Sequence, residues 1–302
     1  MKMTLTKLAE MIADGRGMGT GDKYQPWEQI TRRRASPFSN LNLIPVPHLT
    51  RLAHFLSRGE REFGLLLWWL GAEDVREQYP LWPWPHRQPL DQIRAGEAQM
   101  EPHPGMVSVA KEVGIRLSNY PGLHVPAVLS IDFLVTVPPD VGLQRLVGFS
   151  CKPMALYLRA APTDRLRERI ELDRRYCLAA DIPHHLVHPE QISRTLVVQL
   201  HSLAPIEPWT QLESFIASER YQAYLEHLRG PVYEVPACQA SRRAGAAVGW
   251  FTDEEQRALR IAIWYQHLDV DLSQPLHMTR PLRPGGVVLR AQFQRRWLGR
   301  LS

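Results

Sequence analysis

Two acidic residues and one lysine, far apart in the chain, have the side-chain types that metal-dependent cleavage of a phosphodiester uses. Asp132 is the only charged residue between Val125 and Pro138, in an otherwise apolar stretch. Burying a lone carboxylate in such a stretch costs free energy unless a cation or another partner compensates its charge. Glu60 and Lys152 are the other two residues, and carboxylate oxygens are ligands that Mg²⁺ prefers. The three residues predict a metal site if the fold brings them together.

Two apolar segments have the spacing of adjacent strands that could present Asp132 and Lys152 on one face. Side chains alternate between the two faces of a strand, so Asp132 and Ser130 share a face. The opposite face then carries Leu129, Ile131, Phe133 and Val135. In the second segment, the same alternation separates Ser150 and Lys152 from Val147, Phe149 and Cys151.

Glu60 has a structural interpretation beside the catalytic one. Ser57 and Glu60 have the spacing of a capping box, which would open a helix through residues 63–70. Residues 60, 63, 67 and 70 of that helix fall on one stripe, which would direct the Glu60 carboxylate toward the core. The helix is apolar nearly all round, so Glu62 remains an alternative acidic residue for the site.

Length and composition indicate a globular protein of about two domains. A chain of 302 residues with 44% hydrophobic and 22% charged residues allows about two domains. The longest apolar run, residues 63–71, is too short to span a membrane. The three cysteines form no CxxC pair, and the first residues lack a secretory apolar region, which predicts a reduced, cytoplasmic protein.

The basic residues are mostly arginine, which makes the few lysines informative. The net charge is +5, and only five of the 36 basic residues are lysines. A compact ammonium that orients a nucleophile is a role in which arginine does not replace lysine, so Lys152 stands out. The arginine runs, such as Arg32–Arg34 and those near the C-terminus, are candidates for contacts with a nucleic-acid backbone or are solvated surface charge.

The order of expected elements describes an α/β core followed by helices. Helices are predicted at 4–14, 60–70, 90–99, 107–115 and 163–180, and strands at 75–79, 125–138 and 147–152. The fold class is therefore α/β with a mixed sheet, in a domain of residues 1–188. Residues 189–302 predict a second, mainly helical domain, with a looser segment around Arg242 and a strand at 268–272, which suggests a winged-helix-like arrangement.

Taken together, these segments resemble TnsA, the endonuclease subunit of Tn-seven-type transposition machinery. The resemblance begins in the glycine-rich segment 15–21 with Pro26 and Trp27, and resumes at 54–60 and 75–81. It continues through 130–135 and Ser150-Cys151-Lys152-Pro153, and it closes in the helical segment 169–176. Beyond residue 190, only the general helical layout agrees.

The resemblance implies a restriction-endonuclease-like nuclease core that binds Mg²⁺, with Mn²⁺ as a substitute, and cuts DNA. By this carry-over Glu60 and Asp132 are metal ligands, the backbone carbonyl of Cys151 is a third, and Lys152 holds the attacking water or stabilises charge. Ser150 occupies the position of the family's glutamine, and a hydroxyl is a shorter and weaker ligand than an amide oxygen.

The resemblance also implies partners and a division of labour. The family's proteins cut the 5′, non-transferred strands at transposon ends, while a TnsB-type DDE transposase processes the 3′ ends. A TnsC-type AAA+ regulator is the expected contact of the C-terminal domain. The alternative is a nuclease-fold subunit without catalytic activity that binds DNA and partners, an interpretation that Ser150 favours. An unrelated arginine-rich structural protein would require every matching segment to be accidental.

Overall fold

The computed structural model describes residues 3–30, 42–93, 100–139, 145–161 and 164–299. The predicted run Arg32–Arg34, Arg300 and the second half of the expected helix 90–99 lie outside these residues. The described chain separates into two compact units. The first contains residues up to 44, 52–64 and 71–191, and the second contains 45–51, 65–70 and the residues from 192 onward.

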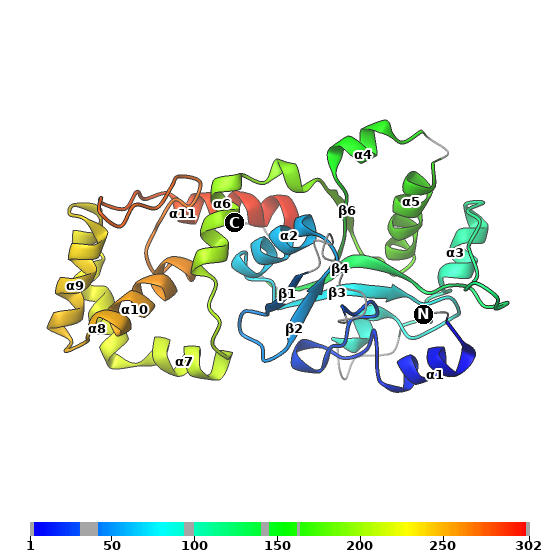
Figure 1. Ribbon diagram of the computed structural model, residues 1–302, viewed down its shortest axis with the longest axis horizontal. Helices are drawn as coiled ribbons and strands as arrows, with labels where there is room; N and C mark the ends of the chain where they lie inside the picture. The colour runs from blue at the N-terminus through cyan, green and yellow to red at the C-terminus, as the bar shows by residue number, and fades with distance from the viewer. Residues whose placement is uncertain (1–2, 31–41, 94–99, 140–144, 162–163, 300–302) are drawn as a thin grey trace. The chain divides into compact units, whose positions relative to one another are not determined.

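A mixed four-stranded sheet forms the centre of the first unit, which confirms the predicted α/β class (Figure 1). Its strand order is β3-β4-β5-β6, with β3 (Asp74–Leu81), β4 (Leu129–Val137), β5 (Arg145–Cys151) and β6 (His184–Val187). The first two pairings are antiparallel and β5 pairs with β6 in parallel. A separate two-stranded sheet joins β1 (Asn42–Pro45) and β2 (Leu52–Phe55).

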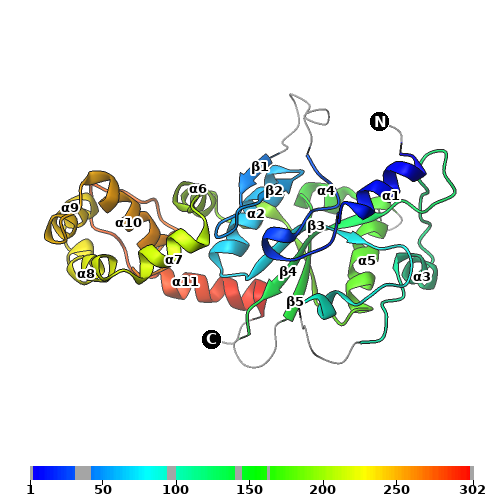
Figure 2. The same ribbon diagram turned by 90° about the horizontal axis from the view of Figure 1, so that it is seen from below.

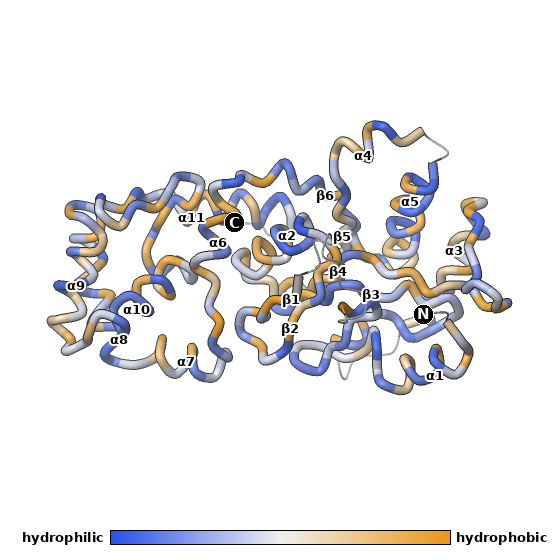
Figure 3. The backbone as a smooth tube through the Cα atoms, in the orientation of Figure 1, coloured by the Kyte–Doolittle hydropathy of each residue, from blue (hydrophilic) through white to orange (hydrophobic). Residues whose placement is uncertain are grey.

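Apolar side chains hold the sheet between helices. The hydrophobic stretch of β4 is plain in Figure 3. Phe133 of β4 packs against Phe55 and against Phe63 of α2 (Arg58–Trp69), with ring centroids 5.9 and 5.8 Å apart. A further core cluster joins Ile131 and Leu134 to residues of α5 (Arg165–Leu178), and α5 lies beside β5 and β6 (Figure 2).

The remaining elements of the first unit are short. They are α1 (Leu5–Ala13), α3 (Met106–Glu112), α4 (Met154–Arg159) and the 3-10 turns η1 (Gly21–Lys23), η2 (Pro89–Gln92) and η3 (Pro189–Gln191). The expected helix at 90–99 is only a 3-10 turn in its described part. Thr4 caps α1 by accepting a hydrogen bond from the amide of Lys7, as a helix N-terminus requires.

Helices make up the second unit, whose described residues from 192 to 299 contain no strand. They are α6 (Arg194–Leu203), α7 (Trp209–Ala217), α8 (Glu219–Leu228), α9 (Ala237–Ala247), α10 (Thr252–Trp264) and α11 (Gly286–Phe293), with η4 (Pro231–Tyr233) and η5 (Gln294–Leu298). Its core contains Tyr221, Tyr224, Ala240 and Ile261, all buried.

Two predictions for the second unit are wrong. The segment expected to be looser is the helix α9, because small residues such as Ala240 and Ala244 let it pack closely in the core. The expected strand at 268–272 has the alternating burial of a strand but no partner strand. Its backbone groups are instead bonded to the side chain of Gln199 and to the carbonyl of Arg283. A wing needs a strand pair, so the described residues 192–299 do not form one.

Candidate active site

Asp132 and Lys152 meet at the point where β4 and β5 separate. The ladder between the two strands ends at the pair Phe133 and Phe149. Beyond it, the amide of Cys151 donates a hydrogen bond of 2.6 Å to Oδ2 of Asp132 instead of to a backbone carbonyl. The ammonium of Lys152 donates to the same oxygen at 2.7 Å. The sequence correctly paired these two residues across neighbouring strands.

The alternation that predicted this face is interrupted next to Asp132. Ile131 belongs to the core cluster that contains Leu134, whereas Phe133 packs against Phe63. A regular strand would place Ile131 and Phe133 on the same face. On the other side of β4, Gln78 of β3 has a φ of 50° and is missing from the register between Glu77 and Tyr79. Both irregularities interrupt the regular backbone pairing around Asp132, and polar side chains form hydrogen bonds there instead.

Glu60 is held in place by the first turn of α2. Ser57 donates from its hydroxyl to Oε1 of Glu60 at 2.9 Å and accepts from the Glu60 amide at 3.1 Å. Oε2 accepts from the amide of Leu56 at 2.9 Å and from Nε2 of Gln78 at 3.0 Å. The Ser57 hydroxyl therefore caps the helix as predicted, and the role of Glu60 as a metal ligand stays a prediction. Glu62 instead bonds the exposed Arg58, at 2.7 Å.

Burial and neighbouring charges shift the pKa values of the residues in this cluster. Burial, followed by the charge of Asp132, raises the pKa of Glu60 to about 7, against the lowering effect of its hydrogen bonds from Leu56 and Ser57. Burial alone lowers the pKa of Lys152, but the charge and hydrogen bond of Asp132 outweigh it, so the net shift is upward. Lys152 is therefore a cation at neutral pH. Burial raises the pKa of the Cys151 thiol well above its usual range, so its sulfur stays protonated.

Ser150 points toward helix α5. Its hydroxyl is fully buried and lies 2.8 Å from Oδ2 of Asp173 and 3.0 Å from Nε2 of His184. A hydroxyl has one proton, and an ionised carboxylate can only accept, so Ser150 donates to Asp173. Ser150 then accepts from His184, whose neutral ring carries its one proton on Nε2. Burial, followed by the charge of His185, lowers the pKa of His184 to about 4, which keeps that ring neutral.

Asp173 and Gln78 are residues of this cluster to which sequence reasoning gave no role. Asp173 is buried, and its charge acts on Lys152 together with those of Asp132 and Glu60. Its Oδ1 pairs with Arg169, which also donates to the carbonyl of Ser130 at 2.8 Å. Gln78 links Glu60 to β4. Its Nε2 donates to Glu60, and its Oε1 accepts from the hydroxyl of Ser130 at 3.0 Å. The sequence signal for Gln78 was a polar residue inside a buried strand, and the signal for Asp173 was an acidic residue on the buried side of a helix.

The arrangement leaves part of the cluster open to a ligand. Among the described residues, only Cys151 and Lys152 donate hydrogen bonds to Asp132, both to Oδ2. Oδ1 of Asp132 has no hydrogen-bond donor in the described part of the chain. The described residues contain no group of three or more His, Cys, Asp and Glu side chains placed to hold a metal ion.

The fold and the cluster define a mixed-sheet α/β protein that gathers two carboxylates and a lysine at a break in its sheet. No known family profile matches the chain. It is 29% identical over 221 residues to the transposon Tn7 transposition protein TnsA of Escherichia coli. That match covers 66% of this chain and 70% of the relative. The chain is therefore similar to TnsA over about two thirds of its length, and this similarity agrees with the resemblance that its sequence segments predicted.

Within the described residues, no helix has the length and apolar character needed to cross a bilayer.

Proposed function

We propose that this protein is a metal-dependent DNA endonuclease that cuts the 5′, non-transferred strands at transposon ends. The observation that carries the proposal is a set of hydrogen bonds around one break in the sheet. Lys152 bonds Asp132 across two strands, and Gln78 links Glu60 of the helix to Ser130, two residues before Asp132. The similarity to a transposition protein supports the same reaction. We interpret the first unit as a restriction-endonuclease-like core.

The donor set fits Mg²⁺, with Mn²⁺ as a substitute. Mg²⁺ keeps several of its waters and binds proteins through one or two carboxylates, so a cluster of three acidic side chains is not required. Asp132, through its Oδ1, Glu60 and the carbonyl of Cys151 would hold the ion. When bound, the ion lowers the pKa of a coordinated water and polarises the scissile phosphate.

The chain's own residues position the reacting groups. Lys152 is charged, so it acts as a cation that holds the attacking water or stabilises the phosphate, and not as a base. Ser150 has its hydroxyl bonded to Asp173, so in this arrangement it braces α5 against the end of β5. Gln78 fixes the distance between the carboxylate of Glu60 and β4 through Ser130.

The proposal includes partners. Two carboxylates and a lysine carry no element that reads bases, so we propose that a TnsB-type DDE transposase supplies the recognition of transposon-end DNA. A TnsC-type AAA+ regulator would contact the second, helical unit. Arginines of that unit and of α5 would contact the DNA backbone, so that affinity for DNA falls as salt rises.

The decisive experiment compares two acidic residues of the site with a matched control. Supercoiled DNA with transposon ends is incubated with both partners and Mg²⁺, and breaks at the 5′ ends are mapped. Asp132→Asn and Glu60→Gln should each lower cleavage by about 100-fold or more, because metal ligands contribute several kcal/mol to the transition state. Glu62→Gln, on the same helix but paired with Arg58, should cut like the wild type.

The alternative function is a nuclease-fold subunit that binds without cutting. It replaces the proposal if the wild-type protein binds the end DNA and its partners but leaves both 5′ strands intact. If Glu62→Gln abolishes cleavage and Glu60→Gln does not, the nuclease function stands but its helix ligand is Glu62.

A further inference from the structure

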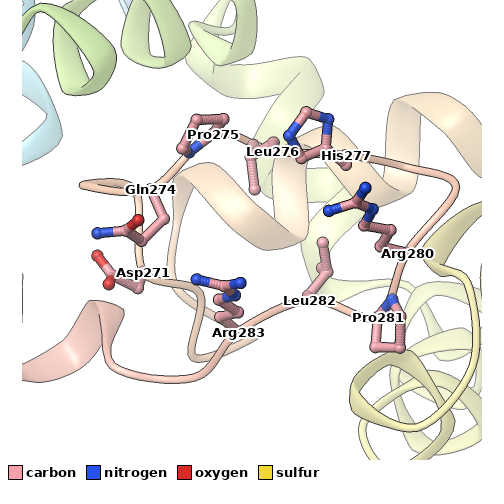
Figure 4. A pocket seen from close by; sticks show the side chains of 9 residues that line it. All are labelled: Asp271, Gln274, Pro275, Leu276, His277, Arg280, Pro281, Leu282 and Arg283. Atoms are coloured by element: carbon pink, nitrogen blue, oxygen red, sulfur yellow. The ribbon is translucent and has the colours of Figure 1, made fainter.

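A proline-rich loop of the second unit, residues 271–283, surrounds a small cavity that has no role in the proposed reaction. The cavity has a volume of about 180 Å³ and is lined by nine residues of this one loop (Figure 4). Four of them carry the argument: Asp271, His277, Arg280 and Arg283. The other walls are mainly apolar, and they include Pro275 and Pro281.

Hydrogen bonds from three directions hold the loop in one conformation. The amide of Asp271 donates to the carbonyl of Arg283 at 2.9 Å and closes the neck of the loop. The buried side chain of Gln199 bonds the carbonyls of Leu272 and Gln274 and the amide of Leu276. The first amides of α9 donate to the carbonyls of Arg280 and Met278, so the loop also caps that helix. A preformed cavity binds its ligand at a smaller cost in conformational entropy.

The charges of the cavity are unbalanced. Arg280 and Arg283 are exposed residues that line the cavity (Figure 4), and neither makes an ion pair or hydrogen bond through its guanidinium within the described chain. His277 also lines the cavity. The single acidic residue, Asp271, uses its Oδ1 to accept the amide of Ser273 at 2.8 Å. Two guanidinium charges against one carboxylate leave a net charge of +1 when His277 is neutral.

We propose that this cavity is a seat for one phosphodiester group of DNA. A backbone phosphate carries one negative charge, which the net charge of the cavity compensates. Guanidinium groups bind phosphate oxygens through paired, charge-assisted hydrogen bonds, and two such groups, three positions apart on the same limb of the loop, offer donors to more than one oxygen of a tetrahedral anion. The proline walls would contact the adjoining deoxyribose. The proposal rests on the proposed function in that DNA is the ligand, but it does not depend on catalysis.

The test measures the salt dependence of DNA binding by the full-length chain in EDTA, so that no cleavage occurs. Binding of a labelled short duplex is followed by fluorescence anisotropy over a series of KCl concentrations. The variant Arg280→Gln with Arg283→Gln should bind about 10-fold more weakly, and its slope of log affinity against log salt should fall by about one, the loss of one phosphate contact.

A matched control removes the same charge elsewhere in the unit. Arg242 and Arg243 are exposed on α9 and line no part of the cavity. The variant Arg242→Gln with Arg243→Gln should keep the wild-type slope. Arg280→Lys with Arg283→Lys keeps the charge but loses the forked donors, and should bind between the wild type and the glutamine pair. Circular dichroism and the melting temperature establish that each variant is folded.

Two outcomes would overturn the proposal, and a third would separate it from the proposed nuclease function. If both glutamine pairs weaken DNA binding equally, the effect is general charge and not the cavity. If the cavity variant binds DNA like the wild type but loses calorimetric binding of inorganic phosphate or affinity for a protein partner, the anion comes from that source and not from DNA. If the cavity variant loses DNA binding but the wild-type protein never cuts DNA, this proposal stands and the proposed nuclease function is wrong.

Discussion

At residue 150 the TnsA resemblance expects a glutamine, and this chain has Ser150 instead. Whether the cluster around Asp132 works without that amide depends on the residues that contact Ser150. Ser150 cannot reach as far as a glutamine, but its hydroxyl is bonded to Asp173, whose charge acts on Lys152. Asp173 therefore supplies a buried carboxylate next to the position where the longer side chain is missing. Arg169 balances part of that charge.

We predict that Asp173→Asn weakens cleavage and leaves binding of end DNA unchanged. The amide still accepts from Ser150 but removes the charge near Lys152, and loss of such a supporting group costs about 10-fold to 100-fold in metal affinity or activity. Cleavage rates measured over a range of Mg²⁺ concentrations should show a higher requirement for the ion. Glu171→Gln on the same helix is the control, because among the described residues Glu171 forms ion pairs only with the exposed Arg174 and Arg175. A wild-type rate and Mg²⁺ requirement in Asp173→Asn would show that Asp173 is only structural.

At the scale of elements, the sequence predicted the parts of the site that depend on local pattern. The strands β4 and β5 and the helices α2 and α5 lie where periodicity placed them, because their apolar spacing determines which side is buried. The segment 268–272 misled the same reasoning, because alternating burial needs no ladder when side chains and loops satisfy the backbone.

The start of helix α11 gives a test of close packing between elements. An ideal Cβ on Gly286 would lie 2.0 Å from the carbonyl oxygen of Val270, whereas one on Gly230 would have no atom within 4 Å. Gly286→Ala should therefore lower the free energy of unfolding by about 1–3 kcal/mol, the usual cost of overpacking. Gly230→Ala is the control and should be close to neutral. Urea unfolding followed by circular dichroism measures both, and equal effects would contradict the packing seen here.

At the scale of the whole molecule, the pH dependence of stability follows from buried histidines. His103 has no exposed surface; its Nδ1 accepts from the amide of Gly105 and its Nε2 bonds the carbonyl of Tyr176. Burial lowers its pKa from 6.5 to about 4, partly opposed by that bond to Tyr176. The folded protein thus keeps this ring neutral where the unfolded chain would take up a proton.

We predict that the first unit loses stability as the pH falls from about 7 toward 4. Above pH 6.5 the ring is neutral in both the folded and the unfolded chain. As the pH falls from 6.5 to 4, only the unfolded chain takes up the proton, and the free energy of unfolding drops by about 3 kcal/mol. Hydrogen exchange of the β4 amides should show this loss, with a smaller slope in His103→Gln. His124→Gln, at an exposed position, should keep the wild-type slope. An unchanged slope in His103→Gln would mean that the ring is not buried neutral.

The sequence alone determined that an α/β sheet would carry Asp132 and Lys152 on neighbouring strands, because burial and alternation are local properties of a segment. It also pointed to Glu60, through a capping pattern within four residues. Only the tertiary structure decided that Gln78 bridges Glu60 to β4 and that Ser150 bonds Asp173. Those contacts depend on where two strands separate and how a helix packs there, and no spacing along the chain encodes the distance between separate elements.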